Sequence, residues 1–143
     1  MKNDLYILQG GIGKNICFTS CINDLGKINI MSTWPKIFKN HPNVNFCYDY
    51  EYYPMKDNIL FFNKFDNVYD IEPYDSYFHK NKIHLVKNFR RLCNLDQGKE
   101  VYNEIYFTEK EEEDIQHIVS SLDSYVLVQF MGSDENLTET DLT

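Results

Sequence analysis

The sequence predicts an α/β domain of the Rossmann-like, three-layer kind with a mostly parallel sheet. Short apolar runs of strand length alternate with helical stretches in the first part of the chain, as is typical of parallel sheets with right-handed crossovers. A glycine-rich turn joins the first expected strand to the first expected helix. The length of 143 residues corresponds to one domain, and a domain of this size folds without disulfide bonds.

The first strand, turn and helix form the best-defined part of this pattern. Residues 5–8 are an apolar run that ends at Gln9 and a glycine pair, too short for a helix and suited to a buried strand. Asn15 is a suitable N-cap for a helix over residues 15–25, where apolar positions recur at helical spacing. Gly26 then stands where a helix is expected to end.

The later elements follow from the same patterns of apolar residues, breakers and caps. Pro35 favours a short helix in its first turn, and Thr108 with Glu111 forms a capping box before a helix. We expect strands at residues 28–31, 44–48, 59–62, 68–71 and 125–130, and helices at 36–39, 83–94 and from 108 onward. Residues 49–57 and 72–81 are expected to be loops.

Composition and charge narrow the classes of function. The formal net charge is −8, and an acidic surface is poorly suited to coating nucleic acid, so we do not expect nucleic acid as a partner. No apolar run approaches the roughly 18 residues of a membrane span, and the N-terminus lacks the features of a signal peptide. We therefore expect the protein in the cytoplasm of a cell or an infected host. The four cysteines contain no C-x-x-C pair and are expected to be buried, reduced thiols.

The strongest chemical signal is the segment Gln9-Gly10-Gly11-Ile12-Gly13-Lys14-Asn15. A glycine turn before a helix exposes backbone N–H groups, which bind phosphate or another anion. In open α/β sheets, ligands collect at the carboxyl ends of the strands, where this turn is expected. We therefore predict a ligand-binding turn made of Gly10, Gly11, Gly13, Lys14 and Asn15. The alternative is that the glycines only permit close packing of the strand and the helix.

Nucleotide-binding motifs match this turn incompletely. A dinucleotide fingerprint would need a third glycine, where Ile16 stands. The phosphate loop of nucleotide hydrolases would need a hydroxyl residue after Lys14, where Asn15 stands. The variant loop of ParA-like ATPases matches residues 10–14, but Gln9 and Asn15 replace its outer lysine and its hydroxyl. An ATPase-like domain is therefore one hypothesis, and its sheet would have a different strand order.

An ordered succession of motifs extends over nearly the whole chain. The first strand, the glycine turn and a helix with Phe18-Thr19-Ser20 are followed by a second strand and Ser32-Thr33-Trp34-Pro35. The turn Asn40-His41-Pro42-Asn43-Val44 then enters the third strand. Later, residues 84–95 resemble the pattern H-L-x(6)-L-G-[IL], with one additional residue, Cys93, and with Asn94 in place of the glycine. A threonine and an acidic run then precede the last strand. This succession resembles the N-terminal domain of heptosyltransferase-like glycosyltransferases, including their shorter phage relatives.

The resemblance implies an enzyme of two Rossmann-like halves with the active site between them. Residues 1–131 would form the half that holds the hydroxyl-bearing acceptor, and residues 132–143 an acidic flexible tail or the start of a missing second domain. The nucleotide-sugar donor would bind the second half, supplied by a further domain or a partner chain. No metal and no cofactor is implied.

One departure concerns the general base. Many members of the family carry an aspartate directly after the glycine turn, proposed as the base. Here that position is Lys14, which cannot act as a base while protonated. Lys14 suits an anionic ligand or a developing phosphate better, so no base is assigned.

Other side chains have two interpretations each. Trp34, Tyr50 and Tyr52 are possible acceptor contacts, because sugar rings stack on aromatic faces, or they serve packing. Two of the carboxylates Asp70, Glu72 and Asp75 could perform acid–base work, or they lie in a solvated loop. A basic cluster could meet an acidic partner, or it is a solvated helix face; its members are Lys80, Lys82, Lys87, Arg90 and Arg91. His84 is a structural histidine or a catalyst.

A third hypothesis is a non-catalytic binding or assembly module. It predicts an intact fold, an exposed aromatic patch and no affinity for small molecules. The ATPase-like hypothesis instead predicts magnesium-dependent nucleotide binding, and the glycosyltransferase hypothesis predicts binding of a nucleotide sugar or a nucleoside diphosphate.

Overall fold

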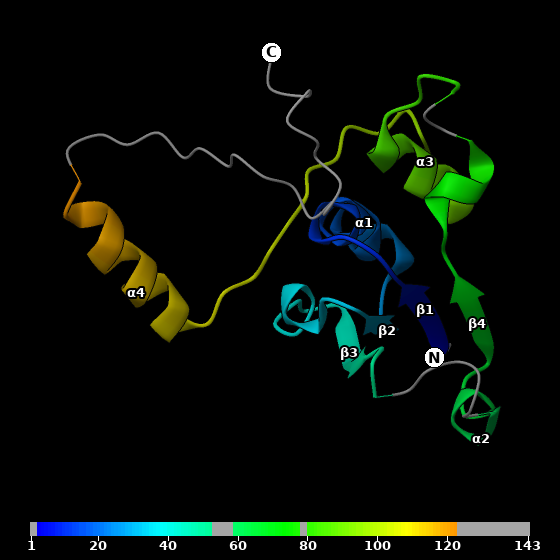
Figure 1. Cartoon of the computed structure of the whole chain (residues 1–143), viewed down its shortest axis with the longest axis horizontal. Helices are drawn as coiled ribbons and strands as arrows, with labels where there is room; N and C mark the ends of the chain where they lie inside the picture. Colours follow the sequence, from blue (N-terminus) through cyan, green and yellow to red (C-terminus); the bar gives the residue numbers. More distant parts are fainter. Residues whose placement is uncertain (1–2, 53–58, 78–79, 123–143) are drawn as a thin grey trace, which may run out of the picture. The chain divides into compact units, whose positions relative to one another are not determined.

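The computed structural model describes residues 3–52, 59–77 and 80–122. The chain forms two units, Met1–Phe107 and Thr108–Thr143, and each is described by itself. The first unit contains the sheet and most of the helices (Figure 1).

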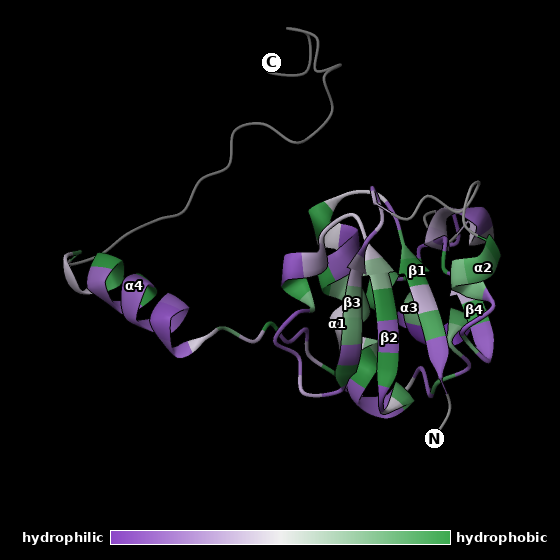
Figure 2. Cartoon of the chain, turned by 90° about the horizontal axis from the view of Figure 1, so that it is seen from below, coloured by the Kyte–Doolittle hydropathy of each residue, from purple (hydrophilic) through white to green (hydrophobic). Residues whose placement is uncertain are grey.

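The sheet of the first unit has four strands in the order β3-β2-β1-β4. They are β1 (Asp4–Leu8), β2 (Ile28–Ser32), β3 (Val44–Asp49) and β4 (Asn67–Asp70). All three pairings between neighbours are parallel, and Figure 2 shows the strands side by side. This is the order of the dinucleotide-binding half of a Rossmann fold, extended by one strand beyond the point where the order reverses. The predicted fold class is confirmed.

Helices α1 (Ile12–Leu25) and α3 (Leu85–Leu92) cover one face of the sheet (Figure 1). The ring of Phe18 in α1 is central to this layer. It makes edge-to-face contacts with Phe89 in α3, at 5.5 Å between centroids, and with Phe38, at 6.4 Å. All three rings are fully buried, so they fix the position of α1 against the sheet.

The other face of the sheet is covered at Leu5, Ile7 and Met31 by Phe61 of the short helix α2 (Ile59–Phe62). The strand predicted at residues 59–62 is therefore wrong. A four-residue apolar run has no period that distinguishes strand from helix. Ile59 and Leu60 are about three-quarters exposed, so the run does not have the continuous burial of an internal strand.

The central strands β1 and β2 are buried at every position. This burial explains their near-continuous apolar sequence. Their polar residues have partners: Asp4 accepts from Asn67 at 2.7 Å, and Asn29 donates to Asn3 at 2.9 Å. The predicted strands at residues 5–8, 28–31, 44–48 and 68–71 are confirmed within one residue at each end.

Two 3₁₀ helices lie in the connections after β2 and β4. They are η1 (Pro35–Ile37), shorter than the helix predicted at 36–39, and η3 (Pro73–Ser76), in a stretch expected to be a loop. Proline opens each of them, as its fixed φ favours. Helix α3 is shorter than the predicted 83–94, because His84 is its N-cap and its C-cap is Cys93.

The described part of the second unit is α4 (Glu109–Ser120). Thr108 and Glu111 form the predicted capping box, with both reciprocal bonds present. No residue of α4 is buried, and the apolar side chains of Ile115 and Ile118 are exposed. Three predictions lie outside the described residues: the strand at 125–130, the domain boundary at residue 131 and the tail 132–143. Within the described residues, none of the helices has the length and apolarity needed to span a membrane.

Candidate functional site

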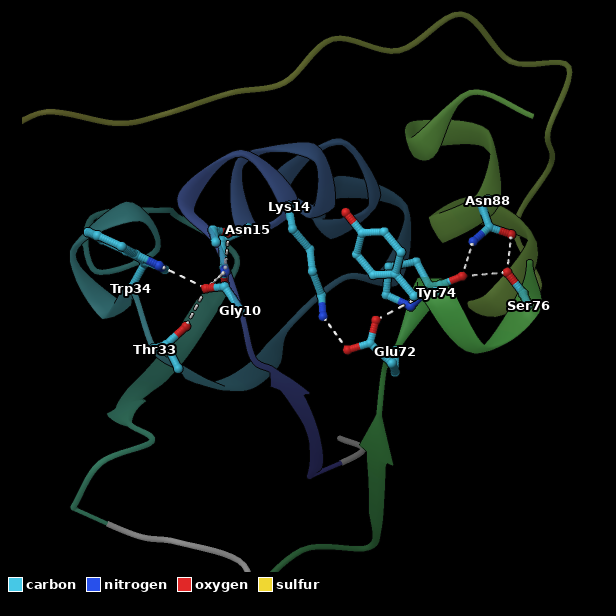
Figure 3. A network of polar contacts seen from close by, with 11 residues as sticks. Gly10, Lys14, Asn15, Thr33, Trp34, Glu72, Tyr74, Ser76 and Asn88 are labelled. Carbon is cyan, nitrogen blue, oxygen red and sulfur yellow. Dashed lines mark hydrogen bonds and ion pairs between the residues drawn. The ribbon is translucent and has the colours of Figure 1, made fainter. Parts of the chain in front are cut away.

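The carboxyl ends of β1 and β4 meet at the point where the strand order reverses. Ile7 of β1 is in register with Asp70, the last residue of β4. The glycine turn follows β1 and Glu72 follows β4, so both connections leave the sheet at the same edge. In open α/β sheets this crevice is where ligands bind, and Figure 3 shows the side chains that surround it.

The glycine turn contains one strained and two unobstructed positions. Gly10 has φ +92°, a conformation that side chains disfavour. Gly11 is the N-cap of α1 in extended conformation, with no side-chain cap. A Cβ built on Gly11 or on Gly13 would meet no atom within 4 Å. The backbone at the start of α1 therefore borders open space, which a ligand can approach.

Asn15 holds the turn from inside. Its side chain is fully buried and donates to the carbonyl oxygen of Gly11 at 3.0 Å, and at 3.5 Å to that of Gly10. Its amide oxygen accepts from the hydroxyl of Ser32 at 2.8 Å. Helix α1 begins at Ile12 with Gly11 as its N-cap, so the predicted N-cap role of Asn15 is wrong: Asn15 lies within the first turns of the helix. Both ends of the Asn15 amide are engaged, so a ligand contact by Asn15 stays a prediction.

Lys14 bridges the crevice. Its Nζ lies 2.5 Å from Oε2 of Glu72, and the lysine side chain is only 6% exposed. The other Glu72 oxygen accepts from the backbone N–H of Tyr74 at 3.1 Å. Nζ also lies 5.9 Å from the centre of the Tyr74 ring. The positive charge expected to meet an anionic ligand therefore already has a carboxylate partner, and a direct ligand contact by Lys14 remains a prediction.

Asp70 brings a second carboxylate to the same edge. Partial burial and the neighbouring charges of Glu72 and Asp75 raise its pKa above the ordinary value. The ammonium of Lys14 and a hydrogen bond with the Gln9 side chain act in the opposite direction. A carboxylate with a raised pKa is a stronger base than an ordinary one. Such perturbed groups in a crevice are candidates for functional residues.

Two exposed aromatic rings flank the crevice in Figure 3, Trp34 beside the glycine turn and Tyr74 beside Lys14. The indole Nε1 of Trp34 donates to the carbonyl oxygen of Gly10 at 2.9 Å. The hydroxyl of Thr33 donates to the same oxygen at 2.9 Å. The side chain of Trp34 is 43% exposed and that of Tyr74 is 53% exposed. The two rings can therefore stack on a ligand.

Other predicted residues lie elsewhere. Tyr50 packs with the core cluster on the α2 side of the sheet, and Tyr52 is exposed in the turn after β3. No contact of either with the crevice is found among the described residues. His84 is a cap: its Nδ1 accepts from the backbone of Val86 at 3.3 Å. Arg90 is buried and paired with Asp24 at 2.8 Å, so it is structural.

The cysteines and possible metal ligands add nothing to the crevice. All four cysteines are free, and Cys21 alone is buried while the others are partly exposed. Within the described part of the chain, no three His, Cys, Asp or Glu side chains gather in a way that could hold a metal ion.

Sequence reasoning missed the Lys14–Glu72 pair and the place of Tyr74. The two partners are 58 residues apart, and only the neighbouring positions of β1 and β4 bring them together. A usable signal existed, because polar residues directly after a predicted strand lie at the carboxyl edge of a parallel sheet. Glu72 satisfies it, because it directly follows the strand predicted at residues 68–71.

The chain was compared with family models, with curated proteins and with solved structures, and none of them matches it.

Proposed function

We propose that this chain is the acceptor-binding half of a glycosyltransferase, and that the acceptor sugar lies in the crevice between the carboxyl ends of β1 and β4. One observation carries the proposal. A carboxylate of raised pKa, Asp70, lies at the edge of the sheet where an unobstructed glycine turn is flanked by the exposed rings of Trp34 and Tyr74. Sugar recognition combines aromatic faces with polar groups that accept from hydroxyls.

Asp70 takes the role of general base in this proposal. The acceptor hydroxyl oxygen would form a bond to the anomeric carbon of the donor sugar, while the bond from that carbon to the leaving nucleoside diphosphate breaks. Asp70 would accept the hydroxyl proton. Position 14, where the resembled family has its aspartate, is a lysine here. A carboxylate from the end of β4 would therefore replace one from the start of α1.

Lys14 and Glu72 act as positioning residues in this proposal. Their pairing at 2.5 Å leaves the crevice without an uncompensated cation at that point. A neutral, hydroxyl-bearing ligand suits such a surface better than a phosphate does. The nucleotide sugar would come from a second domain or a partner chain, whose groups would stabilise the leaving diphosphate.

The ATPase-like alternative has less support. A domain of that kind is expected to have a different strand order, whereas here β1 lies directly between β2 and β4. The residue in place of the magnesium-binding hydroxyl is Asn15, which is buried and bonded to the turn itself.

The test is sugar binding by the full chain, measured by saturation-transfer NMR with neutral monosaccharides and disaccharides. We expect binding that is lost in Gly13→Ala, because the new methyl group enters the open space beside the helix start. This variant should fold normally, since alanine favours a helix by about 0.5–1 kcal/mol over glycine. Gly98→Ala, a glycine outside the crevice, is the matched control and should bind as the original chain does.

A second variant tests the ring platform. Trp34→Ala should lower sugar affinity, while Tyr52→Ala, which removes an exposed ring elsewhere, should not. Magnesium-dependent binding of ATP that is lost in Gly13→Ala would contradict the glycosyltransferase proposal and favour the ATPase-like hypothesis. Absence of any binding of sugars, nucleotide sugars and nucleotides would favour the non-catalytic module.

A further inference from the structure

Two of the four cysteines lie beside each other where α1 and α3 meet. The Phe18 ring of α1 contacts the Phe89 ring of α3 at 5.5 Å between centroids. Cys21 follows Phe18 by three residues and Cys93 follows Phe89 by four, and residues at these spacings share one face of a helix. The two cysteines therefore face each other one turn beyond the rings, and their thiols share a hydrogen bond.

A buried arginine stands beside this thiol pair. Arg90 lies in the last turn of α3 before Cys93, and its guanidinium donates to the carbonyl oxygen of Ser20 in α1 at 3.3 Å. The Ser20 hydroxyl lies 3.9 Å from the sulfur of Cys21. A positive charge and a hydrogen-bond donor near a thiol favour its thiolate form, which is the reactive one.

The hydrogen bond makes the two thiols titrate as a pair. It is the largest cause that lowers the pKa of Cys21, with Ser20 and the charge of Arg90 acting in the same direction and burial opposing them. The same bond and burial raise the pKa of Cys93. The pair therefore loses its first proton readily and keeps the second. One thiolate beside one thiol is the arrangement from which a disulfide forms.

The two sulfurs differ in their access to solvent. Cys21 is fully buried, whereas Cys93 is partly exposed. Cys93 is also the C-cap of α3, and the chain leaves the helix at Asn94, which has φ +55°. A helix end frays more readily than the middle of a helix. A small oxidant can therefore reach the pair from the side of Cys93, and Cys93 can adjust its position to bond with Cys21.

We propose that Cys21 and Cys93 are a redox modification site, at which a peroxide converts the two thiols into a reversible disulfide bond between α1 and α3. The proton of the ionised pair shifts across the hydrogen bond to Cys21, which leaves the charge on the exposed sulfur of Cys93. This thiolate attacks one oxygen of hydrogen peroxide, the O–O bond breaks and hydroxide leaves, so Cys93 becomes a sulfenic acid.

The second step closes the bond. The thiol of Cys21 gives its proton to the hydroxide, and its sulfur attacks the sulfenic sulfur of Cys93. The S–S bond forms, the S–O bond breaks and the oxygen leaves as water. Two electrons pass from the sulfur pair to the peroxide, so two thiols and one hydrogen peroxide give one disulfide and two waters.

The disulfide would join the elements that carry the two walls of the crevice. Lys14 belongs to α1. Tyr74 belongs to η3, which is held to α3 by Asn88. The Asn88 amide donates to the carbonyl oxygen of Pro73 at 3.1 Å and accepts from the hydroxyl of Ser76 at 3.0 Å (Figure 3). The bond also closes a long loop of the chain, which restricts the unfolded state and so stabilises the folded one.

The experiment is oxidation of the reduced full chain with hydrogen peroxide at low protein concentration, followed by peptide mass spectrometry without reduction. A pair of peptides joined through residues 21 and 93 should appear, and dithiothreitol should remove it. The melting temperature of the oxidised chain should be about 5–10 °C above that of the reduced chain, because a disulfide that closes a long loop stabilises a domain of this size by that amount.

Serine variants assign the bond. Cys93→Ser and Cys21→Ser should each lose both the cross-link and the rise in melting temperature. Cys17→Ser is the matched control, because Cys17 lies one turn before Cys21 in α1 and its pKa is raised by burial. This control should form the cross-link as the original chain does. Circular dichroism checks that the variants fold, and Cys93→Ser, at a partly exposed position, keeps the test decisive if Cys21→Ser unfolds.

The proposal is overturned if the folded chain forms no bond between residues 21 and 93, or if Cys93 is oxidised to a sulfinic acid without a cross-link. A cross-link that survives in Cys93→Ser, or one that is lost in Cys17→Ser, would also overturn it. The experiment involves no sugar and no side chain of the crevice, so its outcome is independent of the proposed function.

Discussion

Asn15 illustrates how one buried amide determines the shape of the glycine turn. It joins the turn to β2 by bonding the carbonyl oxygens of Gly10 and Gly11 and the hydroxyl of Ser32. We expect Asn15→Ala to lower the free energy of unfolding by about 2–3 kcal/mol, because buried polar groups lose their partners. Urea unfolding measures the change. Asn63→Ala, at an exposed asparagine, should change it little; equal effects of the two variants would contradict this role.

The glycines of the turn should differ in their tolerance of a side chain. Gly10→Ala should destabilise the chain by about 1–2 kcal/mol, because its φ of +92° is strained for any residue with a Cβ. Gly13→Ala should stabilise it by about 0.5–1 kcal/mol, as a helix residue with open space around it. Thermal unfolding of the two variants gives the comparison. Equal destabilisation would show that the turn is not as described.

His41 should make the stability of the first unit depend on pH. Burial lowers its pKa below the ordinary value; the nearby charge of Glu104 opposes this shift and that of Lys27 adds to it. The unfolded chain therefore takes up the proton more readily than the folded chain does. The contribution of His41 is fully present above about pH 6.5, the unfolded pKa, and is lost as the pH falls through the lowered folded-state pKa.

The measurement is urea unfolding of the original chain and of His41→Gln at pH 7.5 and pH 5.5. The loss of stability on acidification should be smaller in His41→Gln. The control His117→Gln, in α4, should keep the full loss. A loss unchanged in His41→Gln would contradict the prediction.

Among the elements, α1 and α3 are joined by a buried arginine. Arg90 of α3 donates to the carbonyl oxygen of Ser20 in α1 at 3.3 Å and pairs with Asp24 at 2.8 Å. We expect Arg90→Met to destabilise the chain by about 2–4 kcal/mol, because the buried hydrogen bonds and the ion pair are lost together. Arg91→Met removes an exposed charge from the same helix and serves as the control in urea unfolding. A similar effect of both variants would contradict this role of Arg90.

The prediction of elements succeeded where an apolar run lay next to a glycine turn or where a helix had a capping box. The strands β1 and β2 were predictable because they are buried on both faces, and α4 because Thr108 and Glu111 cap it. The run at residues 59–62 was not, because its conformation depends on packing Phe61 against the sheet rather than on a local period. Similarly, the start of α1 depends on tertiary bonds of Asn15, which local cap preference cannot include.

For the whole molecule, the strand order determines what the crevice contains. The glycine turn was visible in the sequence, as were Asp70 and Glu72 as separate candidates. The proximity of the glycine turn to these two carboxylates was not visible, because it requires β4 to lie next to β1 rather than next to β3. For the same reason, the pairing of Lys14 with Glu72 was not visible in the sequence, and the ligand contact expected of Lys14 stays a prediction.

The most direct test of the central claim uses Trp34, the only tryptophan of the chain. Its indole N–H gives a single side-chain signal in a proton–nitrogen NMR spectrum, and it is bonded to the carbonyl oxygen of Gly10 in the turn. If the crevice binds an acceptor sugar, titration with a neutral sugar that binds the chain moves this signal progressively, and Gly13→Ala abolishes the movement. If the sugar binds and the signal stays in place, or if ATP with magnesium moves it and no sugar does, the acceptor-site account is wrong.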